Sequence, residues 1–382
     1  MKRVLYLIGF DLRGGSTICA LELIKKIQQT EFKPTVVTLY KNDFNDFCTK
    51  NNIENYSCHF GRICSMSRGF IGRSIAFFMR PILNYIAFKR LKQKIDFNDI
   101  KIVHSNDTCI DFGAYLHKKK GVLHFWHVRD FFLFDRKWPP LVKNLPCYMS
   151  KNATKIITVS KALENYLISN GCPQNKVQTI YDGIAVPSKL PIISHSELSK
   201  DVLNVACVGQ ICRLKGQMTL IESISKMTDD EQRHFKFVFF GEVKNDVKEE
   251  LAKKLKEPKL EQCIEFKGFS KSILSDLTSY DIGVQPSHSE GFSRVTAEYM
   301  ATGLCVVAAE EGAIPELIQH NENGLLYEDF NSDDLKEKLL YCYNNQEKMR
   351  LLGEKARIKF FDNYELGINQ KNILELYNRF LG

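Results

Sequence analysis

The chain has 382 residues, of which 44% are hydrophobic and 26% charged, and its formal net charge is +8. This length favours two domains, and the composition excludes a disordered or fibrous protein. No apolar run reaches the roughly 18 residues of a membrane span. The 12 cysteines are scattered and form no C-x-x-C. We therefore expect reduced, buried thiols in the cytosol rather than disulfides or a zinc site.

The amino terminus, MKRVLYLIGFDLRGG, places two basic residues before an apolar run. Asp11 follows this run at once and a small-residue cleavage site is absent, so we interpret Val4–Ile8 as a buried strand and not as a signal peptide. A glycine loop containing Gly15 and a helix from Thr17 to Gln29 come next. This start is typical of a nucleotide-binding α/β fold, although it lacks G-x-G-x-x-G.

The segment 62–94 contains eight Lys or Arg and no acid, so it carries the whole excess of positive charge. Aromatic and aliphatic residues interleave with these basic residues, and Pro81 is expected to kink or break the helix. This composition suits the surface of an anionic membrane. It also suits nucleic acid, or a helix pair packed in the core with a solvated basic edge. We favour the membrane surface and expect no nucleic-acid partner.

Two predicted strands follow, at Lys101–His104 and Val122–Trp126. The second is followed by His127, and a side chain at the carboxyl end of a parallel strand faces the edge where ligands bind. His127 is therefore a candidate ligand-binding residue; the alternative is a histidine that only caps local backbone. His124 is expected inside the sheet. Farther on, Ser160 is predicted as the N-cap of another helix.

Residues 187–200, PSKLPIISHSELSK, are rich in Pro and Ser and lack periodicity, which predicts a linker. Strands and helices alternate on both sides of it, so we expect two parallel α/β domains, 1–187 and 201–365. The second opens with a predicted strand at Val202–Val208 and the sequence V-G-Q-I-C-R-L-K-G. Lys215 lies at a helix start, where a cation opposes the helix dipole. An anionic ligand would remove this penalty; the alternative is an ordinary exposed lysine.

Residues 280–312 have the composition of a β–loop–α–β unit, with strands at 281–286 and 304–309 and a helix at 292–300. Its loop lies where open α/β sheets bind ligands, and the helix amino end offers N–H groups that suit a diphosphate. Glu290 and Glu298 would be about 12 Å apart along a helix. This separation exceeds that of glycosidase carboxylates, but it suits the two ends of a longer ligand. The alternative is two solvated helix-edge acids.

The sequence E-G-F-S-R-V-T-A-E at 290–298 resembles the E-x7-E motif of the retaining glycosyltransferases of family 4. The resemblance continues through Y-D-I-x-V-x-P-S before it and through A-x-G-x-x-V-V-A, G-A-I-P-E-L-I and N-G-L-L after it. That family has the GT-B fold, in which two Rossmann-like α/β domains face a cleft. The family more often has Gly where Ser293 stands, and Arg where Gln210 stands.

The resemblance implies a role for each motif residue. Glu290 would contact the transferred sugar, Glu298 the nucleotide ribose, and Lys215 the diphosphate. His127 would contact the donor sugar from the first domain, and helix 366–382 would pack back on that domain. The remaining residues that we expect to bind substrate are Gly15, Arg213, Phe269, Gly291, Phe292, Ser293, Arg294 and Val295.

The reaction implied by the resemblance is transfer of a sugar from a nucleotide diphosphate sugar to an acceptor hydroxyl, with retention. Domain 201–365 would bind this donor, and domain 1–187 a sugar or a lipid-linked sugar acceptor. We expect no cofactor, and no metal because a D-x-D triplet is absent. The expected setting is bacterial surface polysaccharide synthesis (lipopolysaccharide, capsule or exopolysaccharide), in the cytoplasm, on the inner face of the plasma membrane through 62–94.

Three other functions stay open at this point. A nucleotide-sugar epimerase of the same fold would need acids placed to move a ring proton. An NAD dehydrogenase would need the glycine fingerprint that is missing here. A non-catalytic module that binds sugar, nucleotide or nucleic acid would account for the basic segment but not for the context of the E-x7-E motif.

Overall fold

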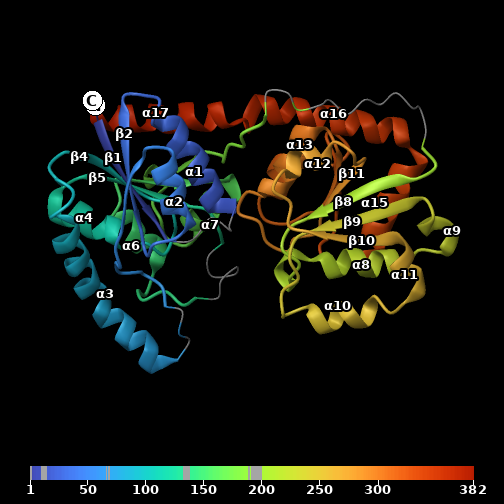
Figure 1. The fold of residues 1–382 in the computed structure, drawn as a ribbon, viewed down its shortest axis with the longest axis horizontal. Helices are drawn as coiled ribbons and strands as arrows, with labels where there is room; N and C mark the ends of the chain where they lie inside the picture. The colour runs from blue at the N-terminus through green and yellow to red at the C-terminus, as the bar shows by residue number, and fades with distance from the viewer. Residues whose placement is uncertain are drawn as a thin grey trace. The chain divides into compact units, whose positions relative to one another are not determined.

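The computed structural model describes residues 2–9, 15–65, 67, 69–131, 138–187, 190 and 200–382. The chain divides into two compact units, one formed by Met1–Gly183 with Leu366–Gly382 and the other by Ile184–Glu365. We call them the amino-terminal and carboxy-terminal units. Each is a parallel β-sheet with helices packed on it (Figure 1). Residues 11–14 of the predicted glycine loop, Arg68 and most of the predicted linker lie outside the described residues.

The amino-terminal unit contains a seven-stranded sheet in the order β3-β2-β1-β4-β5-β6-β7, with parallel pairing throughout. Its elements in chain order are β1 Lys2–Ile8, α1 Gly15–Ile27, β2 Phe32–Thr38, α2 Asp43–Lys50, β3 Glu54–Ser57, α3 Phe70–Leu91, β4 Ile100–Ser105, α4 Phe112–Lys120, β5 Leu123–Val128, α6 Leu145–Lys151, β6 Lys155–Thr158, α7 Lys161–Ser169, the 3-10 turn η1 Gln174–Lys176, β7 Val177–Thr179 and, from the end of the chain, α17 Leu366–Leu381.

Both faces of this sheet are buried, as expected for a parallel sheet. Along β1, Val4, Tyr6 and Ile8 belong to one apolar cluster, and Leu5 and Leu7 belong to another, because successive side chains point to opposite faces. The first cluster also contains side chains of α1, α2 and α17, and the second contains side chains of α3 and α4. In Figure 1 the red α17 lies beside the blue α1, although the two are at opposite ends of the chain.

Helix α3 differs from the other helices of this unit because most of it is exposed. Only Asn84, Ala87, Phe88 and Leu91 are buried, all near its carboxyl end. Its amino-terminal half extends away from the sheet (Figure 1). The expected break at Pro81 is wrong: the helix continues through it. Proline removes one N–H donor, and because Pro81 is exposed, water can satisfy the carbonyl that this donor would have paired.

The carboxy-terminal unit contains a six-stranded parallel sheet in the order β10-β9-β8-β11-β12-β13. Its elements are β8 Leu203–Val208, the 3-10 turn η2 Arg213–Lys215, α8 Gln217–Ser225, α9 Asp229–Gln232, β9 Phe235–Phe240, α10 Lys248–Lys254, α11 Pro258–Cys263, β10 Ile264–Gly268, α12 Ile273–Leu277, β11 Ile282–Gln285, α13 Arg294–Thr302, β12 Cys305–Ala309, α14 Ile314–Leu317, β13 Leu325–Tyr327, α15 Ser332–Asn344 and α16 Gln346–Asn363.

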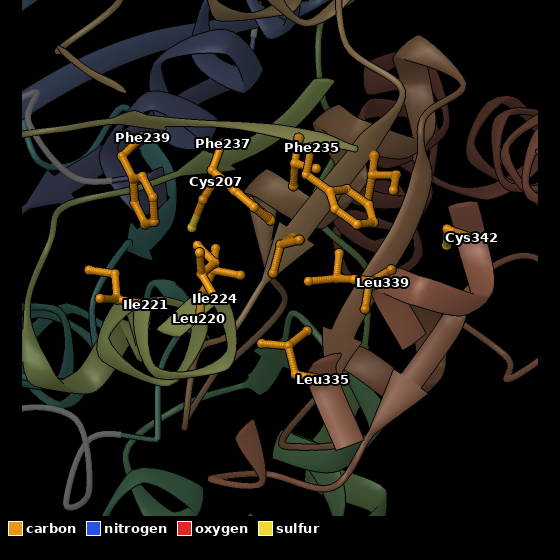
Figure 2. Close-up of a cluster of buried hydrophobic side chains, with 14 of the residues drawn as sticks. Cys207, Leu220, Ile221, Ile224, Phe235, Phe237, Phe239, Leu335, Leu339 and Cys342 are labelled. Atoms are coloured by element: carbon orange, nitrogen blue, oxygen red, sulfur yellow. The ribbon is translucent and has the colours of Figure 1, made fainter. Parts of the chain in front are cut away.

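Alternate side chains of β9 build the apolar core on one face of this second sheet. Phe235, Phe237 and Phe239 all join one cluster, which α8 covers with Leu220, Ile221 and Ile224 and α15 covers with Leu335, Leu339 and Cys342 (Figure 2). This packing fixes the strands at the centre of the sheet, and the loops that follow those strands carry the candidate site. Among the described residues, no helix is both long and apolar enough to cross a membrane.

Candidate functional site

The loop between β11 and α13 is held from below by Tyr299. This side chain is fully buried against Gly283, where a Cβ would lie only 2.4 Å from the aromatic ring. Its hydroxyl accepts a hydrogen bond from the backbone N–H of Val208 at 2.7 Å, which ties α13 to the end of β8. At the other end, Gly303 has φ 84° and closes α13 as a left-handed C-cap residue.

Ser293 is the N-cap of α13 and adopts φ 70°, in the left-handed region that favours glycine. Its hydroxyl compensates for this conformation. The Oγ accepts from the backbone N–H of Thr296 at 3.4 Å and from Nε2 of Gln285 at 3.2 Å. The backbone here therefore has the conformation of a glycine position, while the serine adds a cap that glycine could not supply.

Glu290 and Lys215 meet at the centre of the candidate site. Lys215 Nζ lies 2.6 Å from Glu290 Oε1, and Gln285 Nε2 donates to the same oxygen at 2.8 Å. The carboxylate is 11% exposed and the lysine side chain 32% exposed, so this ion pair is only partly screened by water. The second oxygen, Oε2, receives neither of these contacts. The Glu290 carboxylate and the Lys215 ammonium group are thus in direct contact, and the Gln285 side-chain amide fixes the carboxylate.

The position of Lys215 depends on close packing between two loops. Gly216 follows the turn η2 with φ 66°, and a Cβ on it would lie 1.8 Å from the carbonyl oxygen of Pro286. The backbone N–H of His288 donates to the carbonyl of Leu214 at 3.0 Å. Only glycine permits this approach, so Gly216 brings the lysine to the loop that carries Glu290.

Gly312, beyond β12, supports the backbone of Glu290. Its φ is 57°, and a Cβ there would lie 2.5 Å from the carbonyl oxygen of Glu290. That carbonyl accepts a hydrogen bond from the backbone N–H of Ala313 at 2.9 Å. The segment after β12 therefore fixes the peptide that carries the candidate acid.

The remaining residues proposed for the donor occupy varied environments. Glu298 is buried and accepts from Arg294 Nε at 2.9 Å, one helical turn away. Arg213 is on η2 beside Lys215, but its guanidinium is 68% exposed and pairs with Glu250 at 3.1 Å. Phe269 is 73% exposed just after β10. Phe292 is buried edge-to-face against Tyr364, so only its backbone is available to a ligand.

For three more predicted substrate-binding residues the structure shows only a position in the backbone and a degree of burial. Gly291 is buried next to Glu290, and Val295 is partly buried in the first turn of α13. Gly15 is exposed at the first residue of α1, in the amino-terminal unit.

His127 belongs to a buried polar cluster at the carboxyl end of β5. It lies within the strand, which extends to Val128, rather than after its end as the sequence suggested. Its Nδ1 lies 3.1 Å from His104 Nε2 and 3.3 Å from Arg129 Nη2. Arg129 is itself held by an ion pair with Asp182 and by a 2.8 Å bond to Asn106 Oδ1. These contacts fix the orientation of the His127 ring and of the Arg129 guanidinium.

Burial determines the protonation of these histidines. It lowers the pKa of His127 and of His104 well below 6.5, and the nearby Arg129 cation lowers both further. Burial also lowers the pKa of His124 to about 3; as expected, this residue lies inside the sheet, where its Nδ1 bonds the carbonyl of Asn152 at 2.7 Å. All three rings are therefore neutral at pH 7.

Sequence reasoning missed several residues that shape these clusters. Gln285 looked like one more strand residue, and Gly312 like an ordinary turn glycine. Arg129, two residues after His127, had no assigned role. The G-A-I-P-E-L-I motif did contain a signal for Gly312, because a glycine in the loop after a buried strand is a typical site of close backbone approach.

Nearly the whole chain matches known glycosyltransferases. Residues 191–359 match the family described as glycosyl transferases group 1, and residues 13–186 match glycosyltransferase family 4. An uncharacterized glycosyltransferase of Methanocaldococcus jannaschii is 27% identical over 362 residues, covering 94% of this chain and 92% of the relative. The amylovoran biosynthesis glycosyltransferase AmsK of Erwinia amylovora is 26% identical, covering 62% of this chain and 59% of its own length.

Solved structures show the same fold at low identity. Anabaena HepE in complex with UDP superposes with a TM-score of 0.80 at 19% identity, covering 99% of this chain and 100% of HepE. The sucrose-phosphate synthase of Thermosynechococcus elongatus gives 0.77 at 16% identity, covering 100% and 99% of the two chains. Two parallel α/β units with this likeness make the fold GT-B. Together with the matches along both halves, they show that the chain belongs to the group 1 glycosyl transferases and is a glycosyltransferase.

Proposed function

We propose that this glycosyltransferase moves a sugar from a nucleotide diphosphate sugar to an acceptor hydroxyl, with retention of configuration. The observation that carries this proposal is the contact between Lys215 and Glu290 at the amino end of α13. A cation and a hydroxyl-binding carboxylate this close suit two adjoining parts of one donor, the diphosphate and the sugar. HepE, which has the same fold, has been solved with UDP and with UDP-glucose, which supports a donor of this class.

Each residue then has a defined part in the reaction. The bond from the sugar's anomeric carbon to the diphosphate breaks, and the acceptor hydroxyl forms a new bond on the same face. Lys215, helped by the amino end of α13, stabilises the negative charge on the departing diphosphate. Glu290 accepts hydrogen bonds from the sugar hydroxyls, and Glu298 accepts from the ribose. His127 donates to the donor sugar. No metal is required, since a lysine and a helix terminus supply the positive charge.

The other residues proposed for the donor contribute mostly through backbone or shape. Gly291, Phe292, Ser293, Arg294 and Val295 present the amino end of α13 to the diphosphate, and Gly15 does the same at the start of α1. Phe269 offers an exposed ring beside the nucleobase. Arg213 reaches the diphosphate only by leaving Glu250. We assign donor binding to the carboxy-terminal unit and acceptor binding to the amino-terminal unit.

The pathway that we propose is bacterial surface polysaccharide synthesis, such as lipopolysaccharide, capsule or exopolysaccharide. The names of two relatives support it. One is the amylovoran enzyme, and the other is the poly(ribitol-phosphate) alpha-N-acetylglucosaminyltransferase of Staphylococcus aureus, 26% identical over 68% of this chain and 51% of its own length. The first name refers to amylovoran biosynthesis and the second to poly(ribitol-phosphate), and we propose a sugar or lipid-linked sugar acceptor for this chain.

We further propose that α3 holds the enzyme on the inner, anionic face of the plasma membrane. An apolar stripe at helical spacing is exposed along it, and we call this stripe the α3 face: Ile71, Ile75, Phe78, Ile82, Tyr85 and Ile86. Exposed basic residues lie on the same helix or just after it, namely Arg73, Lys89, Arg90, Lys92 and Lys94. The sequence left open a helix pair packed in the core; of α3, only the carboxyl end packs there, through Ala87, Phe88 and Leu91. Arg80 does not belong to this surface, because it is partly buried 3.6 Å from Asp111.

The test of the enzymatic proposal is incubation with a panel of nucleotide sugars, with measurement of released nucleotide diphosphate and of the sugar product. We expect release from one donor class, stimulated by an acceptor and giving a retained linkage. An epimerase would interconvert sugars with no acceptor present, and a binding module would do neither. Either outcome, or an inverted linkage, would contradict the proposal.

A further inference from the structure

The cluster around His127 contains a chain of hydrogen bonds that starts on the last helix. Tyr6 and Tyr377 hydroxyls are 3.1 Å apart, Tyr377 lies 2.6 Å from His104 Nδ1, and His104 Nε2 lies 3.1 Å from His127 Nδ1. These side chains come from β1, α17, β4 and β5, and each is at most 1% exposed. Water therefore does not compete for these bonds.

Arg129 decides the direction of this chain. A guanidinium has only donors and stays protonated, so the Arg129 N–H that faces His127 Nδ1 requires an unprotonated nitrogen there. Were Nδ1 protonated, two donors would face each other at 3.3 Å in a buried site. The Asp182 carboxylate and Asn106 hold Arg129 in place, so it cannot turn aside.

The remaining protons follow from this one constraint. With His127 Nδ1 as an acceptor, the bond from His104 requires a proton on His104 Nε2. A neutral ring carries only one, so His104 Nδ1 is an acceptor and Tyr377 must donate to it. Tyr6 then donates to the Tyr377 oxygen. Every bond in the chain has the same direction, towards His127.

The consequence appears on the far nitrogen of His127. Neutral His127 with an unprotonated Nδ1 must carry its proton on Nε2, and this atom is buried with no hydrogen-bond partner among the described residues. A buried N–H without a partner destabilises the protein, unless a ligand oxygen accepts its hydrogen bond. The three other members of the chain have their bonds within the protein; His127 Nε2 is the open end.

We propose that Tyr377, on the carboxy-terminal helix, is a positioning residue that acts through His104 to keep the His127 proton on Nε2. His127 thereby serves as a fixed hydrogen-bond donor to a ligand oxygen and not as a proton acceptor. That this oxygen belongs to the donor sugar rests on the proposed function. The direction of the hydrogen bonds from Tyr6 to His127 is independent of that function.

The direction can be tested without any activity measurement. Protein labelled with ¹⁵N at its nine histidines is recorded in a long-range ¹⁵N–¹H spectrum at pH 7, with His104 and His127 assigned by substitution. We expect both rings neutral and protonated on Nε2. In Tyr377→Phe, His104 Nδ1 loses its donor, so we expect a second tautomer of His104. A His127 ring protonated on Nδ1, or a cationic ring at pH 7, would overturn the inference.

The kinetic test compares Tyr377→Phe with Tyr6→Phe. Both remove one hydroxyl from the same buried pair, but only the first removes the proton given to His104. With the donor identified by the panel, we expect kcat/KM for that donor to fall about five- to tenfold in Tyr377→Phe and to stay within twofold in Tyr6→Phe. Inhibition by the matching nucleotide diphosphate, which has no sugar, should be unchanged in both.

These outcomes separate the two proposals. Equal losses in both variants, or equal weakening for the sugar-free nucleotide, would show only a structural role and overturn the inference. The expected tautomers in a protein that releases nucleotide diphosphate from no donor would refute the proposed function alone.

Discussion

Lys215 Nζ and Glu290 Oε1 are 2.6 Å apart, although 74 residues separate them in the chain. Each holds the other through a charge-assisted hydrogen bond, and Gln285 fixes the shared oxygen. In the proposed reaction this is where the sugar meets the diphosphate, so the two side chains act at the bond that breaks.

Glu290→Ala should therefore reduce turnover much more than Glu298→Ala. We expect kcat to fall at least about a hundredfold for the first, as for loss of a group that stabilises a transition state. For the second we expect mainly a raised donor KM, because the ribose is remote from the reacting carbon. Steady-state kinetics on both variants, with a thermal melt to verify folding, measures this. Raised KM values for both with kcat unchanged would contradict the assignment.

Activity should survive excess EDTA. In the proposed reaction, Lys215 and the amino end of α13 supply the positive charge that a divalent cation supplies in other transferases. Lys215→Met is the matched variant, since it keeps the length of the chain and removes the charge; its activity should be low with or without added Mg²⁺. A wild-type loss in EDTA that Mg²⁺ or Mn²⁺ restores would show that the metal-free proposal is wrong.

Gly312→Ala should impair catalysis through the backbone of Glu290. The new Cβ would lie 2.5 Å from that residue's carbonyl oxygen, so the peptide must shift. Gly121→Ala is the control, because Gly121 has a similar φ of 67° but no atom within 4 Å of the added Cβ. Both should lose about 1 kcal/mol of stability to left-handed strain. Only Gly312→Ala should also lose kcat, by about tenfold or more; equal kcat values in the two variants would count against this role.

The α3 face should bind vesicles of phosphatidylglycerol in co-sedimentation. Replacing Ile75 and Phe78 with Ser should weaken binding at every salt concentration and leave the melting temperature unchanged, because both side chains are exposed. Replacing Arg73, Lys89 and Arg90 with Gln should weaken binding at low salt only, since each charge contributes about 1 kcal/mol that salt screens.

Arg80→Gln is the control variant for these charge replacements, because Arg80 is on the same helix but is partly buried and paired within the protein. It should lower the melting temperature, because it leaves the buried Asp111 without its cation. Wild-type protein that stays in the supernatant at low salt would end the membrane proposal.

Stability should decrease as the pH falls below 6.5. His104, His124 and His127 have lowered pKa values in the folded state, chiefly through burial, so below 6.5 the unfolded chain binds protons that the folded chain does not. Each ring then costs up to about 1.4 kcal/mol per pH unit. Urea denaturation from pH 7.5 to 5 measures the slope, and His124→Gln should reduce it by one ring's share. A flat profile over this range would contradict neutral buried rings.

Much of the fold could be predicted from the sequence because strands buried on both faces are nearly continuous apolar runs. Val4–Ile8 and Val202–Val208 were placed to within two residues on this signal. Local chemistry was also reliable: Ser160 caps α7 as expected, by accepting from the N–H of Leu163 at 3.2 Å. By contrast β3, with the polar sequence Glu54–Ser57, has no such signal because it is an edge strand.

The sequence predicted candidate residues for the site but not the contacts between them. Two separate motifs singled out Glu290 and Lys215 as candidates, but the contact between these residues depends on how two loops meet through Gly216 and Pro286. No pattern in the sequence singles out Tyr377. The partner of its hydroxyl is on β4, 273 residues away, and no local pattern reports a contact at that distance.

Helix α17, at the end of the chain, packs in the amino-terminal unit, and this has a consequence for folding during translation. Ile373, Leu376 and Tyr377 complete the apolar core of a sheet whose strands are all made before residue 184. During translation the carboxy-terminal unit must emerge in full before that core can close. At about 5–20 residues per second this leaves an interval of roughly 10–40 s. During this interval the nascent amino-terminal unit exposes the apolar surface that α17 later covers. We therefore expect chaperones to bind this part of the nascent chain.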